Sequence, residues 1–185
     1  MKIGVALSGG GIRGIAHAGA LKAFEENGIN IDIIGGTSSG SLVAVLYAMG
    51  YTPYYIYMLF KRYAQELITV DTTPIINTVS SFITNKKNQV YGFNTGEAIE
   101  KAYNEIAQRK GIKYISDIKM PIAIPAVDVK TSKEYVFTNN KSKSRYISDI
   151  PVGTAVRASS SFPGVFCPCI YKEYTFLDGG ILDNI

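Results

Sequence analysis

The stretch IDIIGGTSSGSLVAVLYAM, residues 31–49, decides the fold of this chain. Its first part, residues 31–35, is short and rich in β-branched residues, which predicts a buried strand. Its last part, residues 39–49, is longer and largely apolar and stops at Gly50, which predicts a buried helix. A strand that passes through a glycine-rich turn into a helix is the repeating unit of α/β proteins.

The same alternation of strands and helices extends toward both ends of the chain. Further strands are expected at residues 3–8, 122–129, 134–138 and 174–177, and further helices at residues 14–27, 53–67 and 95–110. This order predicts a three-layer α/β/α sandwich with a mainly parallel central sheet. The 185 residues, 46% apolar and 18% charged, suit one packed domain over residues 1–185 and exclude a disordered or collagen-like chain.

The turn at the centre of the opening stretch, Gly36-Thr37-Ser38-Ser39-Gly40, matches the pattern G-x-S-x-G. In this pattern a serine lies on a tight strand-to-helix turn, and flanking glycines let neighbouring segments approach closely. The N-terminus of the following helix directs its free N–H groups at the serine and favours a developing oxyanion. Ser38 is therefore a candidate nucleophile, and a serine that only caps the helix is the alternative.

The group that would activate Ser38 cannot be a downstream histidine, because the chain's single histidine, His17, precedes the serine. The Ser–acid–His order of the α/β-hydrolases is therefore impossible. His17 lies about one turn into the first expected helix, where a structural role is the more usual one. The base that activates Ser38 must then be a carboxylate or a lysine, or there is no base at all.

Asp178, in the run Leu177-Asp178-Gly179-Gly180, supplies such a carboxylate at the end of an expected strand. Because the carboxyl ends of parallel strands share one edge of a sheet, we expect Asp178 on the edge that carries Ser38. A serine–aspartate dyad is chemically reasonable if partial burial raises the pKa of the aspartate. An ordinary Asp-Gly turn is the alternative.

Another glycine-rich turn, SGGGIRG at residues 8–14, follows the first expected strand. It satisfies the dinucleotide pattern G-x-G-x-x-G at Gly9, Gly11 and Gly14, and Asp32 lies 18 residues further on, where a ribose-binding acid is sought. A nucleotide-binding oxidoreductase of the Rossmann type is therefore the main rival. Two observations argue against this nucleotide-binding rival. Asp32 lies at the beginning of the second expected strand, whereas the ribose-binding acid should lie at its end, and the Arg13 side chain would intrude where the backbone must bind the pyrophosphate. As a nest of backbone N–H groups, the turn would instead hold an oxyanion, with Arg13 as a charged donor.

Taken together and in this order, the three motifs resemble those of the patatin-like phospholipase family, which is related in fold to cytosolic phospholipase A2. Residues 158–166, ASSSFPGVF, are also similar to the family's segment before its last motif, so the resemblance extends from Leu7 to Asn184. It implies a patatin-like fold and a lipid acyl hydrolase, of phospholipase A or esterase type. Such an enzyme works through an acyl-enzyme, without a metal or a cofactor.

The resemblance also gives the motif residues their roles. It implies that Ser38 is the nucleophile and Asp178 its base. It places the oxyanion hole at Gly9, Gly10, Gly11 and Arg13, and its other motif glycines are Gly14, Gly36, Gly40, Gly179 and Gly180. The serines at 159, 160 and 161 lack the strand and turn that a nucleophile needs.

The chain departs from the family in one respect. Family domains usually run further past the third motif, whereas this chain stops at Ile185, seven residues after Asp178. A domain truncated at its C-terminus, with an exposed edge or face of the sheet, is therefore an expectation. An inactive, truncated patatin-like module is the second rival to the hydrolase.

The net charge of +4 is uneven, because residues 109–145 hold nine Lys and Arg against three acids. Such a basic sector favours an anionic membrane surface, and the aromatic run YTPYYIYMLF at residues 51–60 suits a lip that contacts lipid. A solvated surface and a core helix are the alternatives. We expect an acyl-ester lipid as substrate, weak and salt-sensitive membrane contact, and no nucleic-acid partner.

We expect no signal peptide, no transmembrane segment and no metal. No apolar run approaches the ~20 residues of a membrane helix, and the first apolar stretch is too short for a signal peptide. A cytoplasmic or peripheral membrane location follows. One histidine, and two cysteines that flank Pro168, give no metal-site spacing.

Overall fold

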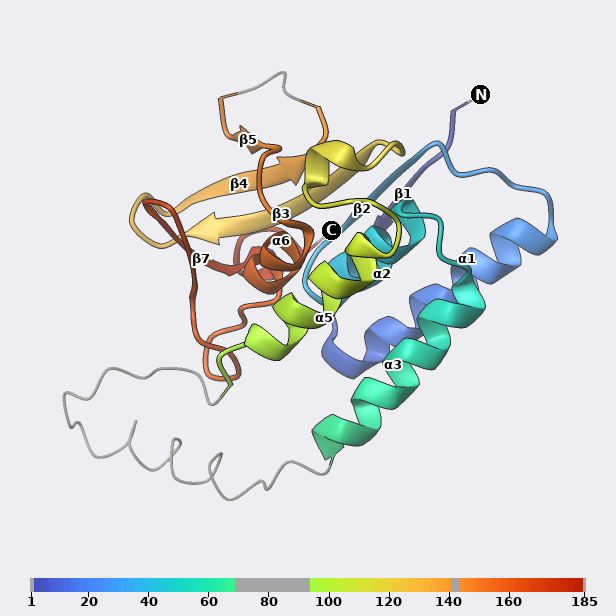
Figure 1. Cartoon of the computed structure of the whole chain (residues 1–185), viewed down its shortest axis with the longest axis horizontal. Coiled ribbons are helices and arrows are strands. Elements are labelled where there is room, and N and C mark those ends of the chain that lie inside the picture. Colours follow the sequence, from blue (N-terminus) through green and yellow to red (C-terminus); the bar gives the residue numbers. More distant parts are fainter. Residues whose placement is uncertain (1, 69–93, 141–143, 185) are drawn as a thin grey trace.

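The computed structural model describes residues 2–68, 94–140 and 144–184, which fold around one seven-stranded sheet (Figure 1). The strands are β1 (Gly4–Leu7), β2 (Ile33–Gly36), β3 (Ile122–Asp128), β4 (Lys133–Thr138), β5 (Tyr146–Ile147), β6 (Cys169–Tyr171) and β7 (Tyr174–Asp178). The α-helices are α1 (Ile15–Glu26), α2 (Ser39–Ala48), α3 (Pro53–Ile68), α5 (Glu97–Gln108) and α6 (Val152–Ser159). Short 3-10 helices are η1 (Gly11–Gly14), η2 (Ile115–Asp117) and η3 (Gly179–Ile181).

The sheet has a parallel part and an antiparallel part. Strands β1, β2 and β3 are parallel neighbours, and β4 and β5 continue the sheet beyond β3. Strand β3 pairs antiparallel with both β4 and β7, and β6 pairs antiparallel with β7. The predicted α/β sandwich class is confirmed, with a mixed sheet at its centre; of the three layers expected, the described residues supply the sheet and one layer of helices.

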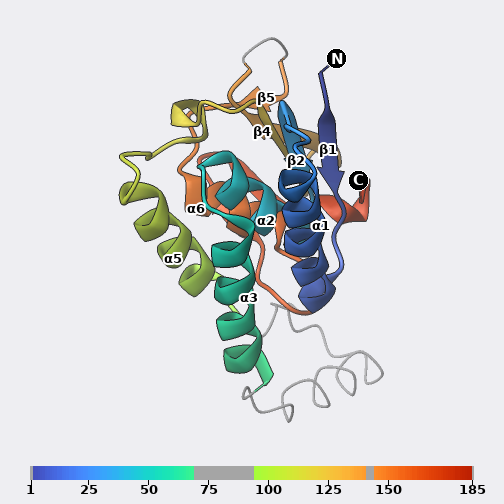
Figure 2. The ribbon, with the colours of Figure 1, turned by 90° about the vertical axis from the view of Figure 1, so that its right-hand side faces the viewer.

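The α-helices among the described residues lie on one face of this sheet (Figures 1 and 2). Crossovers between parallel neighbours are right-handed, so two successive crossovers along the order β1–β2–β3 place their helices on the same face. Helix α2 packs against β1 and β2, α6 packs against β3, β6 and β7, and α1, α3 and α5 pack on these two helices. On the opposite face Ile33 is 45% exposed, and the described ranges contain no second helical layer there.

Strands β2 and β7 end head to head along one edge of β3. Strand β2 pairs in parallel with Ile122 and Ala123, and β7 pairs antiparallel with residues 126–128, while β4 occupies the other edge. The carboxyl ends of β2 and β7 therefore face each other across a short gap. Asp178 ends β7, and Ser38 follows the last residue of β2 by two positions. The sequence argument expected both residues at the carboxyl ends of parallel strands. In the structure β7 runs antiparallel to β3, and its end meets the end of β2.

The core lies between the sheet and the helices. Alternate strand residues such as Leu7, Ile34 and Ile124 are buried under the helices. Helix α2 is buried along most of its length, as the apolar run after Ser38 predicts. Among the described residues, no helix is both long and apolar enough to cross a membrane.

The sequence argument misses helix α6 and strands β5 and β6. Helix α6 has only eight residues, too few for its pattern to stand out. Its buried positions Val152, Ala155, Val156 and Ser159 nevertheless repeat at the spacing of a helical face, which was the available signal. Helix α5 begins at Glu97, two residues later than expected, because Gly96 with φ 73° occupies its N-cap.

Candidate active site

Ser38 lies between β2 and α2 in a strained backbone conformation. Its φ is 53° and its ψ is −124°, a region that costs a residue other than glycine roughly 1–3 kcal/mol. The chain closes tightly around it. A Cβ atom on Gly36 would overlap the backbone of Gly40, and one on Gly40 would overlap the carbonyl oxygen of Leu7. Close backbone packing therefore requires both glycines of G-x-S-x-G and gives the turn one shape.

The N-terminus of α2 lies directly behind this serine. The Ser39 N–H begins the helix and has no hydrogen-bond partner within the described residues. A Cβ atom on Gly14 would lie 2.7 Å from the Ser39 Oγ, so Gly14 lets the first helical segment pack against α2. Free N–H groups at a helix N-terminus carry partial positive charge, which favours a negative atom beside Ser38.

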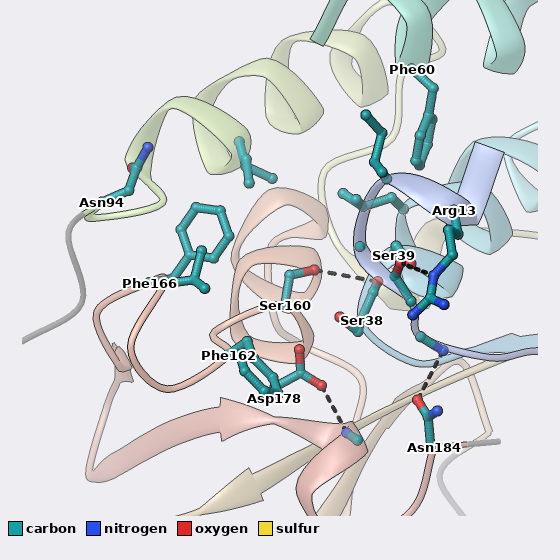
Figure 3. Close-up of a pocket in the computed structure, with 18 of the residues that line it drawn as sticks. Arg13, Ser38, Ser39, Phe60, Asn94, Ser160, Phe162, Phe166, Asp178 and Asn184 are labelled. Atoms are coloured by element: carbon teal, nitrogen blue, oxygen red, sulfur yellow. Dashed lines mark hydrogen bonds between the residues drawn. The ribbon is translucent and has the colours of Figure 1, made fainter. Parts of the chain in front are cut away.

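Asp178 presents a buried carboxyl group beside this turn. The residue is 1% exposed, and its Oδ1 accepts a hydrogen bond from the Gly180 N–H at 2.8 Å. Its Oδ2 is buried without a hydrogen-bond partner among the described residues. Burial raises the pKa of Asp178, and the nearby Ser38 hydroxyl and the hydrogen bond from the Gly180 N–H oppose that rise. Figure 3 shows the Ser38 and Asp178 side chains close to each other in one pocket.

The glycines after Asp178 shape the end of β7. A Cβ atom on Gly179 would overlap the carbonyl oxygen of Pro125 in β3, so this position requires glycine. Gly180 supplies the N–H that holds the carboxyl group. The D-G-G motif thus fixes the direction in which Asp178 leaves its strand.

The glycine-rich loop at residues 8–14 borders the same pocket. The Gly9 N–H donates to Oδ1 of Asn184 at 3.0 Å, whereas the N–H groups of Gly10 and Gly11 have no partner in the described part of the chain. Arg13 is exposed, lines the pocket, and its Nε donates to the Gly10 carbonyl at 3.4 Å. The loop therefore offers backbone donors and one cation to a negatively charged atom.

The pocket itself is a cavity of about 720 Å³ with mostly apolar walls. Its apolar lining includes Leu42, Phe60, Ile99, Phe162, Val165 and Phe166. Cavities of this size, apolar with a few convergent polar groups, are typical ligand sites. Here the polar groups include the hydroxyl of Ser38 and the carboxyl group of Asp178, so the cavity suits an apolar molecule that carries one reactive polar group.

The family model for patatin-like phospholipase matches residues 5–185. This chain belongs to the patatin-like phospholipase family. Among curated relatives of this patatin-like chain, the uncharacterized protein YqhO of Bacillus subtilis is 33% identical, over 100% of the chain and 65% of YqhO. Lysophospholipase NTE1 of Meyerozyma guilliermondii is 34% identical, over 99% of the chain and 11% of that protein. The chain thus spans less than two thirds of the length of either relative.

Solved structures agree with the patatin-like fold. VipD from Legionella pneumophila superposes with a TM-score of 0.62 at 15% identity, over 100% of this chain and 47% of VipD. The ExoU chain of the ExoU–SpcU complex from Pseudomonas aeruginosa gives 0.54 at 24% identity, over 89% of this chain and 37% of the other. At these identities the likeness is one of fold.

Two residues considered from the sequence of this patatin-like chain lie away from the Ser38–Asp178 pair. The Nε2 atom of His17 lies 2.8 Å from the carbonyl oxygen of Ser8, so the ring holds the start of the glycine-rich loop. Asp32 precedes β2, and its Oδ2 accepts a hydrogen bond from the Ile3 N–H at 2.7 Å. It therefore lies at the amino end of the parallel strands, whereas the glycine-rich loop follows their carboxyl end.

Cys169 lies in the core, away from the candidate site. Burial raises the pKa of the Cys169 thiol to about 12, so this cysteine is a neutral core group. No cluster of three His, Cys, Asp or Glu side chains that could hold a metal ion occurs within the described ranges.

Sequence reasoning missed three residues that contact the candidate site of this patatin-like chain. Asn184 holds the Gly9 N–H, and nothing but its position after the D-G-G motif marks it in the sequence. Ser159 and Ser160 contact the backbone of Ser38. The sequence argument considers them only as nucleophiles, and their position at the C-terminal end of an unrecognised helix hid their contacts.

Proposed function

We propose that this chain is a lipid acyl hydrolase, of phospholipase A or esterase type, which cleaves fatty-acyl esters with Ser38 and Asp178. One observation carries the proposal: a serine on a strained strand-to-helix turn and a buried carboxyl group at a facing strand end share one apolar cavity. Membership of the patatin-like phospholipase family supports it, as do relatives named lysophospholipase.

The first chemical step joins the acyl group to Ser38. Asp178 accepts the proton of the Ser38 hydroxyl while Oγ attacks the ester carbonyl. The raised pKa of Asp178 suits this task, because a base works best when its pKa approaches the working pH. The tetrahedral intermediate then collapses, the carbon–oxygen bond to the alcohol breaks, and Asp178 returns the proton to the departing alcohol.

The negative oxygen of the intermediate needs donors already in place. The glycine-rich loop, with the N–H groups of Gly10 and Gly11, and the Ser39 N–H at the start of α2 supply them in our proposal. Arg13 adds a cation beside the pocket. We assign the Gly9 N–H a supporting part, because Asn184 already accepts its hydrogen bond.

Water completes the cycle. Asp178 takes a proton from a water molecule, the resulting nucleophile attacks the acyl-enzyme, and Ser38 recovers its proton as the fatty acid leaves. The apolar walls of the cavity would hold the acyl chain through both steps, since burial of each methylene group contributes about 0.8 kcal/mol.

The test is fatty-acid release over a panel of phospholipids, lysophospholipids and neutral esters, run beside fluorophosphonate labelling. We expect hydrolysis and labelling in the parent chain, and a loss of hydrolysis of about 10⁴-fold or more in Ser38→Ala. Ser148→Ala, at a buried serine outside the pocket, is the matched control. A folded parent chain that neither hydrolyses these lipids nor takes up the label would support the rival of an inactive module.

The dinucleotide rival makes a different prediction. It requires an acid near the glycine-rich loop, whereas Asp32 is engaged with Ile3 at the other end of β2. NAD or NADP should therefore leave the melting temperature unchanged. A rise of several degrees at millimolar nucleotide would favour the oxidoreductase instead.

Weak membrane contact is part of the proposal. In the aromatic run, Tyr54, Tyr57 and Met58 are exposed, whereas Ile56 and Phe60 are buried, so α3 turns one aromatic face outward. In the basic sector, Lys110 lies over the Tyr51 ring with 4.8 Å between the Nζ atom and the ring centroid. Lys141 and Lys143 lie outside the described residues.

A further inference from the structure

Three consecutive serines at the C-terminal end of helix α6 contact the backbones of both Ser38 and Asp178. The Ser38 N–H donates to Ser159 Oγ at 3.2 Å, and the Ser160 hydroxyl donates to the Ser38 carbonyl at 3.3 Å. The Asp178 N–H donates to the Ser161 carbonyl at 3.0 Å. Three neighbouring residues thus hold two segments that are far apart in the sequence. We call residues 159–161 the serine bracket.

The serine bracket contacts the strained backbone of Ser38. A residue with positive φ and a side chain keeps that conformation only if its surroundings fix both of its peptide groups. Ser159 accepts a hydrogen bond from the peptide group before Ser38, and Ser160 donates one to the peptide group after it. The same Ser38 carbonyl also accepts from the Ser41 hydroxyl at 2.6 Å and from the N–H groups of Ser41 and Leu42 at 2.9 and 3.4 Å, so Ser160 adds to a carbonyl that the first turn of α2 already holds. Figure 3 shows the Ser160 contact at the wall of the pocket.

The contact with Ser160 also contributes, beside the first turn of α2, to the direction of a donor. The Ser38 carbonyl and the Ser39 N–H belong to one planar trans peptide group, so they point in opposite directions. Holding the carbonyl toward Ser160 and Ser41 therefore aims the Ser39 N–H away from the body of α2. This N–H is one of the donors to which we assign the oxyanion.

The bracket is itself firmly anchored. Helix α6 is buried, and its Gly153 approaches α5 so closely that a Cβ atom there would overlap the Glu100 carbonyl. Glu100 also accepts hydrogen bonds from Thr154 at 2.6 Å and from Arg157 at 2.7 Å. The Ser161 hydroxyl donates back to the Arg157 carbonyl at 2.8 Å. These contacts tie the bracket to two packed helices, so it can hold the two segments at a fixed separation.

We propose that Ser159 and Ser160 are positioning residues, which fix Ser38 relative to Asp178 and to the Ser39 donor. This inference rests on the proposed hydrolase function. Neither hydroxyl takes part in the reaction. Each acts through a hydrogen bond to the backbone of Ser38, so its removal should slow the chemical step and leave the apolar cavity that binds the acyl chain unchanged.

The experiment compares Ser159→Ala, Ser160→Ala and Ser160→Thr in ester hydrolysis. We expect kcat to fall about 10–100-fold in Ser159→Ala and about 10-fold in Ser160→Ala, with KM within about twofold of the parent, because a small misplacement of a reacting group is costly. Ser160→Thr should recover most of kcat, since threonine keeps the hydroxyl and Ser160 borders the cavity, which leaves room for a methyl group.

A second readout is independent of turnover. Hydrogen exchange followed by NMR should show the Ser38 amide exchanging about 10-fold faster in Ser159→Ala, because its acceptor is gone. Ser148→Ala serves as the control for loss of a buried serine and should change neither kcat nor this exchange rate. If Ser159→Ala does not fold, the Ser160→Ala and Ser160→Thr pair decides alone.

The outcomes separate the two proposals. A parent chain without hydrolysis that depends on Ser38 overturns the proposed function, and the positioning role with it. An active parent whose kcat is unchanged in both alanine variants overturns the positioning role alone, even if the melting temperature falls. A fall in kcat that Ser160→Thr does not recover also counts against it.

Discussion

The turn at residues 36–40 and the loop at residues 8–14 follow neighbouring parallel strands, and both are rich in glycine. In the first, here the closed turn, a side chain on either glycine would overlap backbone atoms. In the second, here the open loop, a Cβ atom on Gly11 would have no neighbour within 4 Å, and the residue has φ 58°. Glycine provides close packing at both positions of the closed turn. In the open loop it provides backbone freedom at Gly11, while Gly9 and Gly14 allow close packing against Ser38 and Ser39.

This difference assigns different tasks to two similar sequence patterns. The closed turn has one shape, and its backbone is held by Ser159 and Ser160, so it suits a group whose position must not vary. The open loop keeps the N–H groups of Gly10 and Gly11 without partners among the described residues, so it suits transient binding of a charged atom. Counting glycines in the sequence does not distinguish the two.

The largest effect on the rate is expected from a substitution of Asp178, which lies beside the closed turn. Asp178→Asn should lower kcat about 10⁴-fold, because Ser38 loses the group that accepts its proton. In the parent chain, kcat/KM should fall as the pH is lowered through the raised pKa of Asp178, and the residual activity of the variant should not show this fall. A pH–rate profile of both proteins checks this.

The same carboxyl group predicts the pH dependence of stability. Since its pKa is raised in the folded state, the folded chain holds the proton more tightly, and the free energy of unfolding decreases as the pH rises through that pKa. Asp178→Asn should remove this part of the decrease. Urea unfolding at several pH values is the measurement, and identical pH dependence in both proteins would contradict the assigned burial effect.

A second prediction contrasts the glycines directly. Gly40→Ala in the closed turn should lower the free energy of unfolding by more than about 3 kcal/mol or prevent folding, because the new methyl group overlaps the Leu7 carbonyl. Gly11→Ala in the open loop should cost only about 1 kcal/mol, the usual penalty for positive φ. Equal losses in the two variants would remove the distinction between turn and loop.

A third prediction concerns charge on the open loop. Arg13→Gln should lower kcat about 10²-fold if Arg13 supports the oxyanion, because one preorganised donor contributes that much or more. Arg13→Lys should lose less, since it keeps the charge. The melting temperature should stay the same in both, because Arg13 is exposed. Unchanged rates would limit the donors to backbone N–H groups.

The smallest effect is expected at a membrane. The chain should float with anionic vesicles a few-fold more than with neutral ones at low salt, and about 0.5 M salt should abolish the difference by screening. Equal flotation with both vesicle types would refute the contact predicted for the basic sector at residues 109–145.

Local patterns predicted much of the fold. The strand, turn and helix at residues 31–49 follow from a β-branched run, two glycines and an apolar run, and β2 and α2 have these positions. Helix α6 was missed because eight residues give too short a pattern, and its anchoring to α5 depends on contacts across the chain. Local periodicity carries no information about such contacts.

The candidate site, too, depends on contacts that local sequence patterns do not reveal. The three motifs point to Ser38, Asp178 and the glycine-rich loop from residue types alone. The head-to-head arrangement of β2 and β7 could not be read from the sequence, because strand direction and register are set by pairing with β3. The roles of Asn184 and the serine bracket are likewise hidden, since each is a contact between a side chain and a distant backbone.

The meeting of β2 and β7 along β3 has a consequence for the order of events during synthesis. The turn that carries Ser38 leaves the ribosome before β3 and β7, whereas Asp178, its proposed base, belongs to β7, which pairs with β3. A nascent chain interrupted before Tyr174 would carry the serine and lack its proton acceptor. In our proposal the pair of Ser38 and Asp178 therefore forms only once β7 has paired with β3, so a nascent chain without β7 would not hydrolyse lipid esters.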